Sequence, residues 1–178
     1  MDAFVPFGSP DYLILLGILF LCRAADFLST WVGTPSLAME GNPFVRKMGW
    51  KGSAAFNLLM CVLLARWPFV AMVLSTTSLL VASRNFQSAW LMRSMGEAGY
   101  MDLVGRMLMI RGTGLYLACS FGQAVPVALI GTAVMLFSED LVPFAIGMGV
   151  LAYAFVVLFF SILSVVRLPR PRSTRMEL

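Results

Sequence analysis

The sequence contains no histidine, and only 12% of its 178 residues are charged, whereas a soluble domain has about a quarter. Histidine is the usual general base near neutral pH and the commonest protein ligand for zinc, haem iron and copper. Its absence excludes histidine-dependent serine hydrolysis, histidine-ligated haem and the HExxH metalloproteases. We therefore expect no bound cofactor, and the absence of histidine leaves open whether the chain binds a hard metal cation.

Cysteine is also scarce. The three cysteines, Cys22, Cys61 and Cys119, lie inside apolar runs and have no CxxC spacing. This placement is typical of small buried hydrophobic residues and not of disulfide or metal partners.

Apolar residues dominate the chain. They account for 60% of the chain, and the mean hydropathy is +0.86. One buried core cannot hide so much apolar surface. The composition predicts an all-α, polytopic transmembrane helical bundle that forms a single domain over residues 1–178.

A helix needs roughly 20 apolar residues to span a bilayer. Five runs approach or exceed that length, at about 12–32, 49–66, 68–83, 114–137 and 141–166. Prolines at first-turn positions mark the starts of the first and third runs. The third helix can continue into 84–95, and an apolar stripe at helical spacing predicts a further helix lying in the interface at about 99–110.

Basic residues indicate the orientation, because they accumulate in cytoplasmic loops. With five spans, one side receives eleven of the thirteen lysines and arginines, and the other side receives only Arg66. This distribution places the N-terminus outside and the C-terminus inside. A four-span alternative, with 49–83 as one bent element, would divide the basic segments between both faces. The eleven are Arg46, Lys47, Lys51, Arg84, Arg93, Arg106, Arg111, Arg167, Arg170, Arg172 and Arg175.

This distribution explains the net charge of +4 without a nucleic-acid partner. The basic residues would meet anionic lipid headgroups at the cytoplasmic face of the membrane. We expect the lipid bilayer to be the first partner of this chain.

Two ionisable residues fall inside the first span, where each is expensive to insert and is therefore a functional candidate. Arg23 and Asp26 are three residues apart, so they share a helix face and can pair. Ser29 and Thr30 follow within a turn and place hydroxyls near the carboxylate. The alternative is structural: a paired charge that fixes how the helix packs.

The next loop contains Glu40 and Asn42, followed by Pro43. Asn42 is a plausible N-cap with proline at the first helical position, and capping alone would explain it. Short connections would nevertheless bring Asp26, Thr30, Glu40 and Asn42 together at the cytoplasmic end of the first two spans. Such oxygen ligands suit a hard cation better than a transition metal.

This D-x-x-x-T…E-x-N-P pattern resembles the signature of a family of small prokaryotic membrane proteins of unknown function. The resemblance covers about residues 12–83. It implies a multi-pass protein of a prokaryotic cytoplasmic (inner) membrane, in which Asp26, Thr30, Glu40 and Asn42 act as a set. It implies no particular activity.

Small residues recur every fourth position in the last two spans, which lets helices approach closely. The ridges are Gly114, Ala118 and Gly122 in the fourth span, and Ala145 and Gly149 in the fifth. The pattern does not distinguish a partner helix in the same chain from one in another copy.

Three classes of function are compatible with these sequence features. A membrane enzyme acting on a lipid is the least favoured, because the repeated aspartate motifs of membrane prenyltransferases and alcohol phosphotransferases do not occur. A small oligomeric transporter or channel, with a polar site at Asp26, Glu40 and Asn42, is the alternative. The composition best fits a non-catalytic accessory or scaffold component that assembles laterally, as a homo-oligomer or within a larger membrane complex.

Overall fold

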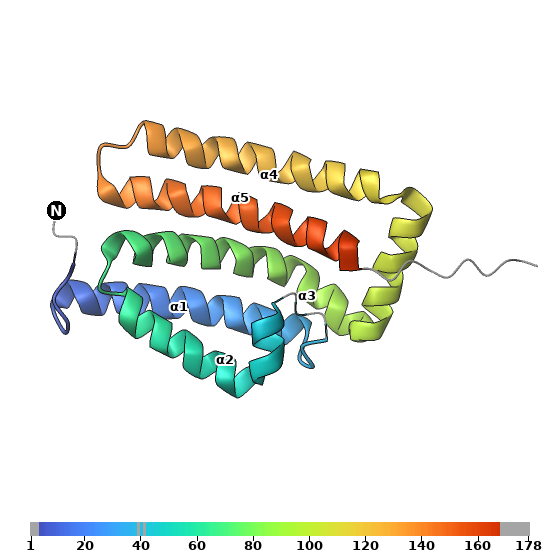
Figure 1. The fold of residues 1–178 in the computed structure, drawn as a ribbon, viewed down its shortest axis with the longest axis horizontal. Helices are drawn as coiled ribbons and strands as arrows, with labels where there is room; N and C mark the ends of the chain where they lie inside the picture. Colours follow the sequence, from blue (N-terminus) through green and yellow to red (C-terminus); the bar gives the residue numbers. More distant parts are fainter. Residues whose placement is uncertain (1–3, 39, 41, 168–178) are drawn as a thin grey trace, which may run out of the picture.

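The computed structural model describes residues 4–38, 40 and 42–167, and the regular structure of these residues is entirely helical. Five helices follow one another along the chain (Figure 1). They are α1 (Pro10–Gly33), α2 (Pro43–Leu64), α3 (Pro68–Arg111), α4 (Thr113–Leu136) and α5 (Leu141–Arg167). The expected all-α bundle is confirmed.

The helix starts agree with the sequence signals. The hydroxyl of Ser9 caps α1 by accepting a hydrogen bond from the Tyr12 amide at 3.2 Å, and Pro10 follows it. Pro43 and Pro68 take the first-turn positions of α2 and α3. Proline suits this position because the first amides of a helix have no partner within it.

The central helix of the bundle is α3, which packs against α1 on one side and α5 on the other. α4 pairs with α5, and α2 lies beside α1 (Figure 1). The Val5 amide donates to the Arg66 carbonyl at 2.9 Å, and at the far end the Ser36 amide donates to Glu97 at 2.9 Å. α1 and α3 therefore begin at the same end of the bundle and run in parallel.

Two glycines divide α2 and α3 into arms. The backbone of α2 kinks at Gly49 (φ 67°) and that of α3 at Gly96 (φ 74°), in a region that side chains disfavour. The first arm of α3 passes Ser83 without a break, as the sequence allowed. The second arm, residues 97–111, crosses the end of the bundle (Figure 1) and matches the helix predicted at about 99–110.

The distribution of side-chain size is that of a membrane protein. Small residues such as Ala71, Ala82 and Ala89 fill the interior, whereas Leu21, Leu129 and other large apolar side chains point outward. Without a hydrophobic force between helices in lipid, close packing of small residues holds them together. Four helices, α1, α3, α4 and α5, are long and apolar enough to span a membrane. α2 is not among them.

The small-residue ridges have different surroundings. Ala145 and Gly149 are buried between α5 and its neighbours, and a Cβ on Gly149 would lie 2.8 Å from the Val73 carbonyl. Gly114, Ala118 and Gly122 are exposed, and a Cβ on either glycine would meet nothing within 4 Å. The ridge on α5 therefore packs within the chain, whereas the ridge on α4 packs against none of the described helices.

The prediction of three buried cysteines is wrong for one of them. Cys61 is buried and Cys22 partly buried, but Cys119 is exposed on α4. The apolar run around Cys119 indicates a membrane span. Within a span an apolar side chain can face either the lipid or the interior of the bundle, so the run does not predict burial.

Segments rich in basic residues lie at one end of the bundle, where α1 ends and residues 97–111 cross. We call this the basic end. The opposite end carries Arg66, Asp11, Glu139 and Asp140. The basic end is defined by Arg46, Lys47, Lys51, Arg93, Arg106 and Arg111; Arg170, Arg172 and Arg175 lie outside the described residues.

Candidate functional site

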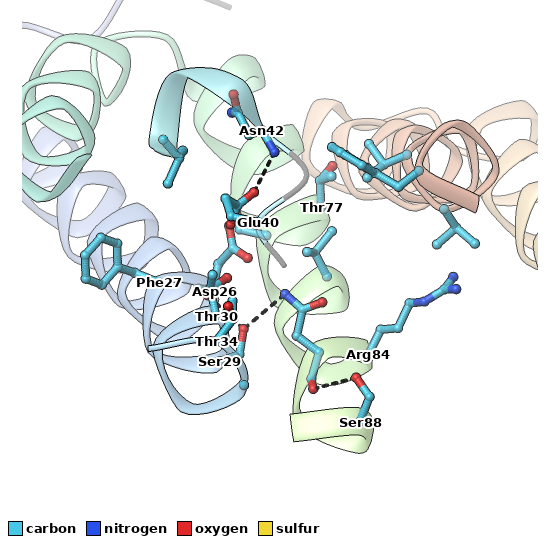
Figure 2. A pocket seen from close by; sticks show the side chains of 18 of the residues that line it. Asp26, Phe27, Ser29, Thr30, Thr34, Glu40, Asn42, Thr77, Arg84 and Ser88 are labelled. Carbon is cyan, nitrogen blue, oxygen red and sulfur yellow. Dashed lines mark hydrogen bonds between the residues drawn. The ribbon is translucent and has the colours of Figure 1, made fainter. Parts of the chain in front are cut away.

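A polar cavity of about 520 Å³ lies between α1, α2, α3 and α5 and extends to the loop before α2. We call it the polar pocket (Figure 2). Its volume falls in the range of small-molecule sites, roughly 300–1,000 Å³. All five residues selected as a candidate site line it: Arg23, Asp26, Thr30, Glu40 and Asn42.

Arg23 and Asp26 form the ion pair expected from their spacing, with Nη1 and Oδ2 2.8 Å apart. The same guanidinium reaches two other helices. Its Nε donates to Asn57 Oδ1 on α2 at 2.9 Å, and its Nη1 donates to Ser78 Oγ on α3 at 3.0 Å. Arg23 therefore joins three helices at the floor of the polar pocket.

The hydroxyls near Asp26 do not bind its carboxylate. Ser29 Oγ and Thr30 Oγ1 donate to the main-chain carbonyl of Asp26, at 2.7 and 3.1 Å. This is the usual back-bonding of serine and threonine within a helix. The two hydroxyls therefore lie within a turn of Asp26, as their spacing predicts, but they bind its main chain and not its carboxylate. Ser29 instead accepts from Asn85 Nδ2 on α3 at 3.3 Å.

Glu40 and Asn42 both serve the start of α2. Asn42 Oδ1 accepts from the Phe44 amide at 3.0 Å, which makes Asn42 the N-cap, and the Asn42 amide donates to Glu40 Oε1 at 2.7 Å. Both side chains also line the pocket, and Glu40 is near enough to Asp26 for mutual electrostatic repulsion (Figure 2). Capping therefore accounts for part of their placement but not for the shared cavity.

Within the described residues, no three histidine, cysteine, aspartate or glutamate side chains gather closely enough to hold a metal ion. Asp26 and Glu40 are the two carboxylates of the polar pocket. Their oxygens are suited to an ammonium group or to a water-bound cation.

Arg84 is the main lining residue that the sequence reasoning missed. It lies halfway along the first arm of α3, and in Figure 2 it extends from the side of α3 that faces α5. Its Nη1 atom is buried and has no hydrogen-bond partner, and no carboxylate of the described chain lies within 4 Å of its guanidinium. No local sequence pattern indicated this role, because it depends on how α3 packs beside α5.

Unpartnered polar atoms are concentrated in this cavity. The described residues contain four buried side-chain polar atoms without a hydrogen-bond partner, and three of them, on Ser53, Arg84 and Ser161, belong to residues that line the pocket. A buried polar group without a partner costs about 1–3 kcal/mol, so such groups need a ligand or water. The polar pocket is therefore built to receive a polar occupant.

The chain was compared with known protein families, with curated proteins and with solved structures, and none of them matches it. The resemblance of the D-x-x-x-T…E-x-N-P pattern to a family signature is not tested by these comparisons.

Proposed function

We propose that this integral membrane protein is a non-catalytic component that binds a small molecule bearing an anionic group in the polar pocket. The observation that carries this proposal is the buried Nη1 atom of Arg84, which has no hydrogen-bond partner on a half-buried residue of the pocket lining. A buried donor without a partner is unfavourable, and the guanidinium fork binds carboxylate or phosphate oxygens in pairs. A bound anion would supply the partner that the described chain does not.

The available side chains favour binding over catalysis. The sequence has no histidine, Asp26 is engaged by Arg23, and Glu40 accepts from the amide of a helix cap. General acid–base chemistry needs a group free to exchange protons with a substrate. The groups present here orient one another instead.

Thermal unfolding of the detergent-purified protein tests this proposal. Inorganic phosphate and O-phosphoethanolamine are the probes, because a ligand that binds only the folded state raises the unfolding temperature. We expect stabilisation of the wild-type chain and its loss in Arg84→Gln. Arg93→Gln, at an exposed position on the same helix, is the matched control and should keep the effect. Equal stabilisation of Arg84→Gln and wild type would refute the proposal.

Lateral assembly is a second candidate role, supported by the exposed ridge of Gly114, Ala118 and Gly122 on α4. A second copy or another membrane protein could pack there closely. The mass of the detergent-extracted particle tests this role. A homo-oligomer or complex that dissociates in Gly122→Leu would support it, and a wild-type monomer without a stoichiometric partner would refute it.

Transport is the remaining use of such a pocket. A transporter would carry its ligand past Asp26, Glu40 and Asn42 toward the basic end. Flux of phosphate in proteoliposomes that disappears in Asp26→Asn would favour transport over binding alone. We also propose, from the distribution of basic residues, that the basic end faces the cytoplasm of a prokaryotic cell.

A further inference from the structure

A second hollow lies on the outside of the bundle, between α1 and α2, with a volume of about 760 Å³. We call it the apolar groove. Its walls are almost entirely apolar, and Phe20, Leu28 and Leu58 on them are about half exposed. Trp31, Trp50 and Lys51 line the part nearer the basic end. In a membrane this groove opens toward the acyl chains.

The apolar groove and the polar pocket share walls. Four residues, Arg23, Phe27, Trp50 and Asn57, line both of them. Two contacts separate the hollows: the hydrogen bond from Arg23 to Asn57, and the edge-to-face stacking of Phe27 on Trp50, whose ring centroids are 4.9 Å apart. Figure 2 shows Phe27 on the side of α1 that faces away from Arg84. An amphiphile lying across these contacts would place a polar head in the pocket and a chain in the groove.

We infer that the occupant is a membrane phospholipid with an amine-bearing headgroup, whose headgroup enters the polar pocket and one of whose acyl chains lies in the apolar groove. This inference rests on the proposed function and names its ligand. The groove follows α1 from Phe20 to Trp31, which is about 17 Å at the rise of an α-helix. One leaflet of the hydrocarbon core is roughly 15 Å deep, so the groove has the length of one chain.

The charges of the pocket suit a zwitterionic headgroup. Two basic residues, Arg23 and Arg84, and two acidic residues, Asp26 and Glu40, line the cavity, so their formal charges cancel. In Figure 2 Arg84 extends from the α5 side of α3, whereas Asp26 and Glu40 lie on the side of α1 and α2. Arg23 and Asp26 already pair with each other, so a phosphate on Arg84 and an ammonium on Glu40 would complete the pairing of these groups.

Tryptophan quenching by a brominated lipid tests the inference. The reporter is a chain with Trp50 as its single tryptophan, made by changing Trp31, Trp67 and Trp90 to phenylalanine. The probe is phosphatidylethanolamine with brominated acyl chains, titrated into mixed micelles. We expect saturable quenching of Trp50. Ala54→Phe, which fills the groove, and Arg84→Gln should each weaken the apparent affinity about tenfold or more.

Matched controls separate this site from the general lipid surface. Ala133→Phe adds the same bulk at an exposed position of α4 and should leave the affinity unchanged. Brominated phosphatidylglycerol, which lacks the amine, should bind more weakly than phosphatidylethanolamine. Quenching that rises without saturation, or that is equal in Ala54→Phe and Ala133→Phe, would overturn the inference. Equal affinity for the two lipids would overturn the choice of an amine-bearing headgroup.

A second measurement does not depend on the tryptophan changes. Native mass spectrometry of the unmodified chain should show one retained phosphatidylethanolamine, which is lost in Ala54→Phe and kept in Ala133→Phe. The outcomes also distinguish the two proposals. If phosphoethanolamine stabilises the protein through Arg84 but no lipid is retained, the lipid inference is wrong and the binding function stands. If Arg84→Gln changes neither result, both are wrong.

Discussion

Arg23 shows how one residue in a membrane span compensates a charge and organises the bundle at once. It binds Asp26 on its own helix, Asn57 on α2 and Ser78 on α3. The two partners of the ion pair therefore differ in what they leave behind when removed. Loss of Asp26 leaves the guanidinium with two acceptors, whereas loss of Arg23 leaves a carboxylate and an amide oxygen without their donor.

This asymmetry gives a prediction for three variants. Arg23→Leu should lower the free energy of unfolding by about 1–3 kcal/mol, and Asp26→Leu by less. The double variant should lose less than the sum of the two, because neither charge is then left alone. Unfolding of the purified proteins by titrated denaturing detergent measures all three. Strictly additive losses would show that the pair contributes no coupling.

Residue spacing predicted part of the site. Arg23 and Asp26 are neighbours along one helix face, so their pairing could be predicted without any knowledge of the fold. The spacing of Ser29 and Thr30 did not reveal what their hydroxyls bind, because the main-chain carbonyl of Asp26 competes with its carboxylate for them. Arg84 was missed because its role depends on α3 and α5 packing together, and no local pattern encodes a contact between distant helices.

At the scale of elements, close helix contacts occur at particular glycines. A Cβ on Gly149 would lie 2.7 Å from Thr76 Cβ and 2.8 Å from the Val73 carbonyl on α3. Gly131 and Gly147 bring α4 and α5 together in the same way, since a Cβ on Gly131 would lie 2.8 Å from the Gly147 carbonyl. Residue spacing provides no reason to prefer these glycines to Gly114 and Gly122, because it identifies a ridge of small residues but not what packs against that ridge.

We expect Gly149→Ala to destabilise the chain by about 1–3 kcal/mol, because the backbone of α3 must move to admit the methyl group. Gly122→Ala is the matched control, since a Cβ there meets nothing within 4 Å. It should leave unfolding of the single chain unchanged. Thermal unfolding in detergent compares the two. A Gly149→Ala variant as stable as the wild type would mean that α3 and α5 are not in close contact at this point.

The kink at Gly96 allows a test of backbone strain. Its φ of 74° and ψ of 157° belong to a region used almost only by glycine, and no neighbouring atom lies within 4 Å of an added Cβ. Gly96→Ala should therefore cost about 1–3 kcal/mol through conformation alone. Gly99→Ala, three residues on in the crossing arm, should be neutral or slightly stabilising because alanine is the better helix former. Equal unfolding temperatures for the two variants would contradict the kink.

The arrangement of the whole molecule indicates a role for α2 that its composition alone does not. α2 has the length of a span but is not among the helices apolar enough to be one, yet α1 and α3 begin at the same end of the bundle. If both cross the membrane, the chain between them must return across it. In that case α2 would be the return, and its polar Asn57 side chain would be compensated by the hydrogen bond from Arg23. Four apolar helices together with this topological requirement would then give five crossings, with the basic and acidic ends on opposite faces.

Cysteine labelling in intact cells tests this arrangement and its orientation together. In a background without Cys22, Cys61 and Cys119, Glu139→Cys lies between α4 and α5, at the end opposite the basic end, and Arg106→Cys lies in the crossing arm. If the basic end faces the cytoplasm, as its excess of arginine and lysine favours, an impermeant thiol reagent should label Glu139→Cys at once and Arg106→Cys only after permeabilisation. The reverse result would invert the protein in the membrane but keep five crossings. Labelling of both positions from outside would contradict the bundle itself, because α4 lies between them and would then not cross.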